Sequence, residues 1–217
     1  MRTTMRNALV VAAALTPLLG AITVAQMNSK PATYITKEEV DTVNKTPGVD
    51  RTIRVVDIGP ENFAVGIIHR GSTRTPPAAG AGGGGGARGG AQAAPDCGML
   101  TGNPAPAGTV SGIAHDSQTE GYYIVSGAGE MITGGHIHHG RKSAADQPVT
   151  TELNGPSCSG AILGDAVRRQ VKVGDIIIIP AGTPHGWTDI PDHVDYLSFR
   201  PSQKVLTAGY VHPSLKK

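Results

Sequence analysis

The stretch GDIIIIPAGTPHGW (Gly174–Trp187) holds four consecutive isoleucines between two turn signals. The glycine and aspartate that open it predict a turn into a short strand over Ile176–Ile179, because branched apolar residues favour strands. The segment Pro180–Pro184 predicts a second, stiff turn that leads directly to His185. Trp187 follows two residues later, so on a strand it shares a face with that histidine. An apolar strand with a rigid turn at each end suits the accurate placement of an imidazole.

A second unusual stretch, HDSQTEGYYIVSG (His115–Gly127), lies upstream and places a histidine before an aromatic, apolar run. Alternate residues of a strand share a face, so Glu120 and Tyr122 point the same way. His115 lies an odd number of positions before Glu120, and on one straight strand the two side chains would face apart. The polar residues between them predict a turn that can bring both into one cavity. With His185, they form a ligand set for a divalent transition metal.

Together the two stretches resemble the motifs of the cupin family. The first cupin motif runs His-x-His, three or four residues, Glu, six residues, Gly. The second runs Gly, five residues, Pro-x-Gly-x-x-His, three residues, Asn. The matching positions in this sequence are His115, Glu120, Gly127, Gly174, Pro180, Gly182 and His185. The resemblance covers residues 52–202, and it extends to single-domain bacterial cupins with TEGYYIVSG, TGG and IPAGTPH patterns. It implies an all-β fold, a double-stranded β-helix or jelly-roll barrel.

The sequence departs from the cupin pattern at two positions. Ile113 stands where the first motif has its earlier histidine, and Asp189 stands where the second motif has asparagine. The usual set of three histidines and one glutamate is thereby reduced to His115, Glu120 and His185. A three-ligand set still binds a metal such as Zn, Mn, Fe or Ni and leaves positions open for substrate or water. The alternative is the remnant of a site that has lost its metal.

Other side chains are weaker candidates for the site. His69 ends a run of alternating apolar residues and could replace the missing ligand, although histidines at strand ends usually meet solvent. Tyr122 could donate a proton or orient substrate, or simply fill the barrel. Trp187 could form a wall of the pocket or part of the core. His136 and His138 are spaced like a metal pair, but they follow a TGG turn without a downstream glutamate, and we expect an exposed loop there.

The rest of the chain predicts one domain with a short helix before it. Thr36 can cap a helix and Glu39 completes a capping box, within an N-terminal segment over residues 26–51. The cupin domain is expected over residues 52–217, where short runs rich in branched residues alternate with glycine and proline. No long helical pattern lies between these runs, which disfavours a parallel βαβ sheet.

Residues 76–95, PPAAGAGGGGGARGGAQAAP, break this pattern. Such a composition cannot bury enough apolar surface to offset its ordering entropy, so we expect a disordered loop inside the cupin domain. A phosphate-binding loop is the other interpretation, but the segment lacks the lysine-serine ending and the following helix.

The N-terminus predicts export. Residues 1–25 combine two arginines, an apolar run and the small-residue cleavage site Thr23-Val24-Ala25, which is typical of a signal peptide; an uncleaved membrane anchor is the alternative. Cleavage removes two of the 19 basic residues and none of the 17 acidic ones, which leaves a formally neutral chain. We therefore expect a periplasmic or secreted protein, without membrane association after cleavage and without a nucleic-acid partner. In an oxidising compartment the two cysteines, Cys97 and Cys158, could pair.

These observations favour an exported, metal-dependent enzyme that acts on a small organic substrate. Glu120 or Tyr122 would handle a proton, and the reaction would be a redox-neutral hydrolysis, elimination or isomerisation, or an O₂-dependent cleavage. The alternative is a non-catalytic periplasmic cupin that binds a small molecule. A structural oligomer, for example a homodimer, is a third interpretation, because cupins commonly pair through strands.

Overall fold

The structure is a computed structural model that describes residues 31–74, 95–202 and 204–216. The signal peptide expected over residues 1–25 lies outside these residues, and so does the glycine-rich segment 76–95 except for its last proline. Thr33–Lys217 is one compact unit, and the description below concerns that unit. Within the described residues, every helix is too short or too polar to cross a membrane.

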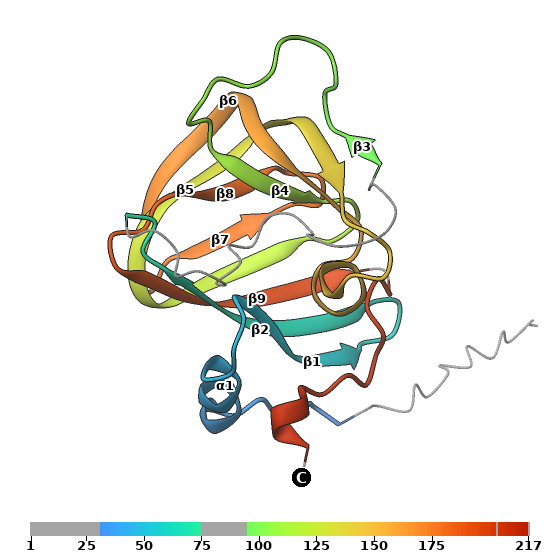
Figure 1. The fold of residues 1–217 in the computed structure, drawn as a ribbon. Helices are drawn as coiled ribbons and strands as arrows, with labels where there is room; N and C mark the ends of the chain where they lie inside the picture. Colours follow the sequence, from blue (N-terminus) through green and yellow to red (C-terminus); the bar gives the residue numbers. More distant parts are fainter. Residues whose placement is uncertain (1–30, 75–94, 203, 217) are drawn as a thin grey trace, which may run out of the picture. The chain divides into compact units, whose positions relative to one another are not determined.

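The described chain consists mainly of β-strands (Figure 1), and the strands β1 to β9 pair with one another in antiparallel fashion. In chain order the elements are α1 (Lys37–Asn44), β1 (Asp50–Asp57), β2 (Asn62–Gly71), β3 (Asp96–Cys97), β4 (Ser111–His115), β5 (Glu120–Lys142), η1 (Val149–Leu153), β6 (Ser157–Lys172), β7 (Ile176–Ile179), β8 (His185–Asp189), β9 (His193–Ser202) and η2 (Pro213–Leu215).

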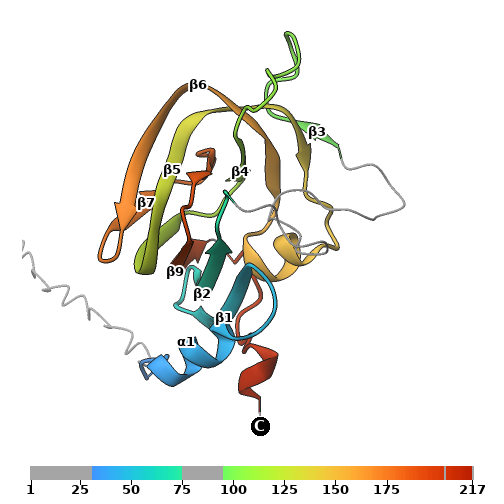
Figure 2. The same ribbon diagram turned by 60° about the vertical axis from the view of Figure 1, so that its left-hand side comes forward.

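Two sheets meet on β5, which is 23 residues long. Its first part pairs with β7 and β9, and its second part pairs with β3, β6 and β8; Figure 2 shows β5 and β6 side by side. Gly127, the last residue of the first cupin-like motif, lies where the partners change. It has φ +70°, and a Cβ there would lie 1.9 Å from the carbonyl oxygen of His193. Glycine is required at this position, and GYYIVSG and GEMITGG, two runs bounded by glycine, belong to one bent strand.

The core lies between the two sheets. Side chains from β2, β7 and β9 meet side chains from β6 and from both parts of β5, and half-buried Trp187 of β8 packs against them. The buried members are Ile68, Tyr122, Ile124, Met131, Val171, Ile179, Ile190, Val194 and Tyr196. Two antiparallel sheets that share a bent strand and enclose one core form the double-stranded β-helix of the cupin fold. The predicted all-β fold with a short N-terminal helix is confirmed.

Helix α1 begins as the sequence predicts. The Thr36 hydroxyl accepts a hydrogen bond from the Glu39 amide at 3.2 Å, and the Glu39 carboxylate accepts one from the Thr36 amide at 3.1 Å. Val43 is buried on one side of this helix, where it packs with Ile53 and Ile67 on the outer face of the β1–β2 pair. The helix thus covers the outside of one sheet and leaves the space between the sheets to the core.

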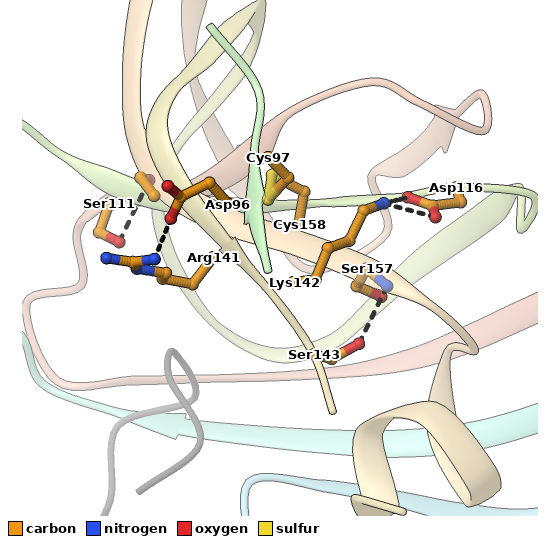
Figure 3. The surroundings of a disulfide bond; sticks show 10 residues. Asp96, Cys97, Ser111, Asp116, Arg141, Lys142, Ser143, Ser157 and Cys158 are labelled. Carbon is orange, nitrogen blue, oxygen red and sulfur yellow. Dashed lines mark hydrogen bonds and ion pairs between the residues drawn. A yellow bond between two sulfur atoms is a disulfide. The ribbon is translucent and has the colours of Figure 1, made fainter. Parts of the chain in front are cut away.

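Cys97 of β3 and Cys158 of β6 form a disulfide, as expected (Figure 3). Both side chains are buried, and they pack with apolar residues on the outer face of the second sheet. Next to Cys158 lies Ser157, which contacts the side chain of His115. The bridge therefore fixes the beginning of β6 close to the residues of the candidate site.

Removal of the disulfide by the double substitution Cys97→Ser and Cys158→Ser should lower the free energy of unfolding by roughly 4 kcal/mol. The bridge joins residues 61 positions apart, and in the chain-entropy model a loop of that length strongly restricts the unfolded chain. Urea unfolding followed by tryptophan fluorescence measures the loss, with reduced wild type as the control. Thiol titration of denatured, unreduced wild type should find no free thiol. Two free thiols would contradict the bridge.

Candidate metal centre

Three side chains predicted as metal ligands lie together in the structure. His115 ends β4, Glu120 begins β5 and His185 begins β8. One ligand atom from each lies within 4.8 Å of the others. Glu120 Oε2 is 3.2 Å from His115 Nε2 and 3.1 Å from His185 Nε2. Their exposed fractions are 2%, 1% and 5%, so water is largely excluded from all three.

Strand pairing explains why the two motifs meet. The turn that precedes β8 is tied to the end of β4, because the Gly182 amide donates a hydrogen bond to the His115 carbonyl at 2.7 Å. Gly182 has φ +78°, a conformation that favours glycine. On β4, Ile113 lies directly opposite His185. Antiparallel partners point their side chains to the same face of a sheet, so Ile113, His115 and His185 share the face that carries the cluster.

Neighbouring groups fix the tautomers of both histidines. His185 Nδ1 lies 3.0 Å from the carbonyl oxygen of Thr183, which can only accept, so Nδ1 carries the proton. His115 Nδ1 lies 2.7 Å from Ser157 Oγ. The Ser157 hydroxyl donates to the Gly155 carbonyl at 2.9 Å, so it accepts the Nδ1 proton of His115. Both imidazoles therefore present the lone pair of Nε2 to the cluster, as metal-binding histidines with oriented outer partners do.

A buried arginine holds the other oxygen of Glu120. Glu120 Oε1 accepts hydrogen bonds from Arg200 Nε and Ser198 Oγ, each at 3.2 Å. Arg200 is fully buried, pairs with Asp50 and donates to the Leu153 carbonyl at 3.2 Å. Glu120 is thus oriented with Oε1 on the guanidinium and Oε2 toward the histidines. Arg200 was absent from the sequence-based site.

The surroundings of this cluster favour an ionised Glu120 beside a neutral His115. Burial alone raises the pKa of Glu120, but the groups around its carboxylate, among them the permanently charged Arg200, outweigh burial, and the pKa lies well below its ordinary value. Burial lowers the pKa of His115, which keeps its imidazole neutral near pH 7. Glu120 is therefore suited to bind a cation, and its carboxyl group is not a proton donor near neutral pH.

The donor set fits a divalent metal. Two nitrogen lone pairs and a carboxylate oxygen converge, and the buried His115 Nε2 has no hydrogen-bond partner among the described residues. A buried polar atom without a partner costs on the order of 1–3 kcal/mol, which a bound cation would relieve. Glu120, Asp50 and Arg200 together carry a net charge of −1, so they also attract a cation. Nitrogen and oxygen ligands of this kind suit Zn, Mn, Fe or Ni.

Tyr122 lies beside the three ligands. Its hydroxyl donates to Glu120 Oε2 at 2.7 Å and lies 3.4 Å from His185 Nε2. Burial, together with the charge of Glu120, raises the pKa of Tyr122 well above its ordinary value. The phenol therefore keeps its proton near neutral pH. Its ring also packs in the core, as the barrel-filling interpretation predicts, and its role toward a substrate stays a prediction.

His69 does not join the cluster. Its imidazole is 48% exposed, and Nδ1 lies 2.6 Å from Asp195 Oδ1 on the neighbouring β9. His69 and Asp195 are opposite each other in the β2–β9 pairing and share the outer face, whereas Ile68 on the other face belongs to the core.

Trp187 is half-buried and packs against Tyr196, with ring centroids 5.6 Å apart.

The exposed loop expected around His136 and His138 is wrong. Both residues belong to β5, where they lie opposite Leu163 and Ala161 of β6. The ladder has irregularities on either side of them, between Gly134 and His136 and after His138, which let the strand continue beyond the TGG turn signal. His138 is buried, and Nε2 contacts the carbonyl of Asn103 at 2.7 Å.

Comparisons with known proteins add no family assignment. No family model matches the chain, and no curated protein matches it. Among solved structures, a Klebsiella pneumoniae protein with a double-stranded β-helix domain is 15% identical, with a TM-score of 0.35; the match covers 81% of this chain and 94% of that one. The Bacillus halodurans protein BH2720 is 14% identical, with a TM-score of 0.37 and coverage of 84% and 89%. An oxalate oxidase is 15% identical, with a TM-score of 0.28 and coverage of 73% and 54%. At these scores the likenesses carry no conclusion about this chain's chemistry.

Substitution Ile113→His should tighten metal binding by roughly 10-fold or more. The new imidazole would start from a strand position opposite His185 and on its face, so little ordering entropy opposes its coordination. It would also fill a position otherwise open to substrate, so turnover should fall as affinity rises. Competition with a chelator compares wild type with Ile113→His, and Ile113→Val is the matched control. A folded histidine variant that holds metal no better than wild type would place residue 113 outside the ligand shell.

Proposed function

We propose that the protein is an exported, metal-dependent enzyme that acts on a small organic molecule. His115, Glu120 and His185 would hold one divalent transition metal. The observation that carries the proposal is the convergence of two Nε2 lone pairs and a carboxylate oxygen, each oriented by a partner outside the cluster. Protein side chains supply three ligands, which leaves coordination positions for substrate or water, as in catalytic rather than structural metal sites.

The chain's own groups divide the chemistry between them. When bound, a divalent metal polarises a substrate oxygen or lowers the pKa of water. Glu120 stays ionised because Arg200 and Ser198 hold Oε1, so it acts as a ligand. Tyr122 keeps its proton and lies within hydrogen-bond distance of Glu120 Oε2, so it is the group positioned to donate a proton. The side chains of His115, Glu120, His185 and Tyr122 are all buried, and the exclusion of water strengthens the electrostatic interactions among them.

A redox-neutral reaction fits this arrangement better than a reaction that needs an external reductant. The Cys97–Cys158 disulfide supports an oxidising compartment, the periplasm or the exterior, where reductants are scarce. Hydrolysis, elimination and isomerisation need a polarised oxygen and a proton donor, and the site offers both. An O₂-dependent cleavage remains within the proposal where the substrate supplies all the electrons.

Metal analysis and turnover together test the proposal. Protein made without a histidine tag should contain divalent metal, and chelation should abolish turnover that metal then restores. The assays follow hydrolysis, dehydration and isomerisation of small oxygenated compounds, with oxygen uptake measured in parallel. Tyr122→Phe should keep the metal and lower turnover by about 10²–10⁴-fold, since only the hydroxyl is removed. Absence of metal would overturn the proposal. Bound metal without turnover across the panel would favour a non-catalytic binding protein.

A further inference from the structure

A second polar cluster lies one aromatic ring away from the candidate metal centre. It consists of Arg70 on β2, Tyr196 on β9 and Trp187 on β8. Arg70 Nε donates to the Tyr196 hydroxyl at 3.0 Å, and Trp187 Nε1 donates to the same oxygen at 3.4 Å. The ring of Tyr196 packs on Tyr122, with centroids 4.4 Å apart, and Tyr122 contacts Glu120. A molecule at this cluster would therefore lie close to the proposed ligands.

Arg70 faces the inside of the fold. It follows Ile68 by two positions on β2, and Ile68 packs in the core between the sheets. Arg70 and Trp187 are half-buried, whereas Tyr196 and the three proposed metal ligands are almost completely covered. Arg70 and Trp187 therefore keep part of their surface in contact with solvent, unlike Tyr196 and the proposed ligands.

The guanidinium has no carboxylate partner among the described residues. Acids close to it in the sheets are engaged elsewhere: Asp50 pairs with Arg200, Asp195 with His69 and Asp189 with Arg74. A guanidinium offers five N–H donors, and for Arg70 one described acceptor, the neutral hydroxyl of Tyr196, receives one of them. A partly buried charge is normally paired, so an unpaired arginine beside two aromatic rings indicates a place for an anion.

We propose that Arg70, Trp187 and Tyr196 form an anion subsite that binds the carboxylate of the substrate, a small organic acid. This rests on the proposed function, since the same molecule would present its reacting oxygen to the metal centre. The planar fork of Arg70 matches a carboxylate with two parallel hydrogen bonds. The face of Trp187 suits the apolar part of such an acid. One guanidinium balances a monoanion, whereas a phosphate dianion would leave excess negative charge near Glu120 and Asp50.

Trp187 is the sole tryptophan of the chain, so its fluorescence reports on the subsite directly. The probes are benzoate, its neutral analogue benzamide and inorganic phosphate, each titrated into metal-free and zinc-loaded protein. Benzoate should bind saturably to wild type. Arg70→Gln should raise its dissociation constant by about 10- to 100-fold, the usual cost of losing a charge-assisted hydrogen bond. Arg70→Lys keeps the charge but loses the planar fork, so its dissociation constant for benzoate should lie between those of wild type and Arg70→Gln. Benzamide should bind weakly, and with the same affinity, to wild type and both variants.

Arg141→Gln is the matched control, because it removes the same charge from the exposed ion pair with Asp96 on the outer face. Its affinity for benzoate should equal that of wild type. Equal benzoate affinities for wild type and Arg70→Gln, no response of wild type to benzoate, or preferential binding of phosphate would overturn the carboxylate subsite. If Arg70→Gln does not fold, Arg70→Lys provides the same comparison.

Zinc content of the same samples separates this inference from the proposed function. Wild type that retains zinc but does not bind benzoate would overturn the subsite and leave the metal centre in place. Wild type that binds benzoate through Arg70 but retains no zinc would overturn the proposed function and support the anion site. Arg70→Gln should hold as much zinc as wild type, since Arg70 contacts none of the proposed ligands in the structure.

Discussion

The His185→Ala protein is expected to lose its divalent metal. The substitution removes one of three ligands and leaves His115 and Glu120, which cannot complete a stable site by themselves. Removal of an outer partner of a metal ligand typically costs about 10–100-fold in affinity, so loss of a ligand itself should exceed ~100-fold. Elemental analysis of untagged protein, dialysed against a weak chelator, should find metal in wild type and almost none in His185→Ala.

A matched control comes from the histidines that lie outside the cluster. His136 and His138 are on β5 but contact none of the three proposed ligands, so replacing both with alanine should leave the metal content unchanged. Equal metal in wild type and His185→Ala would mean that the metal is bound elsewhere. If the double variant loses its metal while His185→Ala retains it, the metal is bound at His136 and His138 instead.

Substitution Arg200→Met should lower the free energy of unfolding by about 3–5 kcal/mol at pH 7, the usual cost of breaking a buried ion pair. Arg200 is fully buried and contacts both Glu120 and Asp50, so its loss leaves two buried carboxylates without their cation. Urea unfolding measures the effect. Arg168→Met, which breaks an exposed pair with Glu130, should cost at most about 1 kcal/mol.

The cost of Arg200→Met should depend on pH in a defined direction. In wild type the pKa of Glu120 is lowered in the folded state, so its contribution to stability is present above the unfolded pKa and is lost as pH falls. Without Arg200 the folded pKa rises, and the folded variant prefers a protonated Glu120. The difference in stability between variant and wild type should therefore shrink between pH 7 and pH 4. A difference that stays constant over this range would mean that packing, rather than charge, accounts for the loss.

The proposed ligands could be predicted because each lies in a motif contained in one short stretch, and the cupin resemblance implied that the two stretches meet. The spacing from His115 to Glu120 and the rigid turn before His185 appear in short stretches of sequence, and the structure brings all three together. The capping box of Thr36 and Glu39 is also contained within one helical turn. Each motif is thus decided by residues close in the chain, whereas the meeting of His115 with His185 depends on the pairing of β4 with β8.

Arg200 was missed because its contact with Glu120 joins residues 80 positions apart. That contact depends on the register of β5 against β9, which no short stretch of sequence specifies. A signal was nevertheless present in VDYLSFRP, where Tyr196, Ser198 and Arg200 alternate with apolar or acidic residues and share one face. An arginine on the inward face of a strand is unusual unless a carboxylate pairs with it.

The error at His136 and His138 has a different cause. The TGG sequence was interpreted as the end of a strand, whereas Gly134 and Gly135 both take positive φ and let β5 bend without leaving the ladder. Glycines serve turns and bulges equally well, and a β-bulge depends on the partner strand. The pairing of β5 with β6, which lies later in the chain, decides whether Gly134 and Gly135 form a turn or a bulge.

The Cys97–Cys158 bridge also limits the effect of a proteolytic cut in the chain between the two cysteines. The exposed stretch from Gly98 to Gly108 offers sites for cleavage between the two cysteines. A single cut there leaves both pieces covalently joined, so the nicked protein migrates intact until a reductant separates it. His115, Glu120, His185 and Arg200 would all lie on the C-terminal piece, whereas Asp50, which pairs with Arg200, and strand β2, which pairs with β9, would lie on the N-terminal piece. The bridge would therefore keep the partners of Arg200 and β9 attached to the piece that carries the proposed ligands.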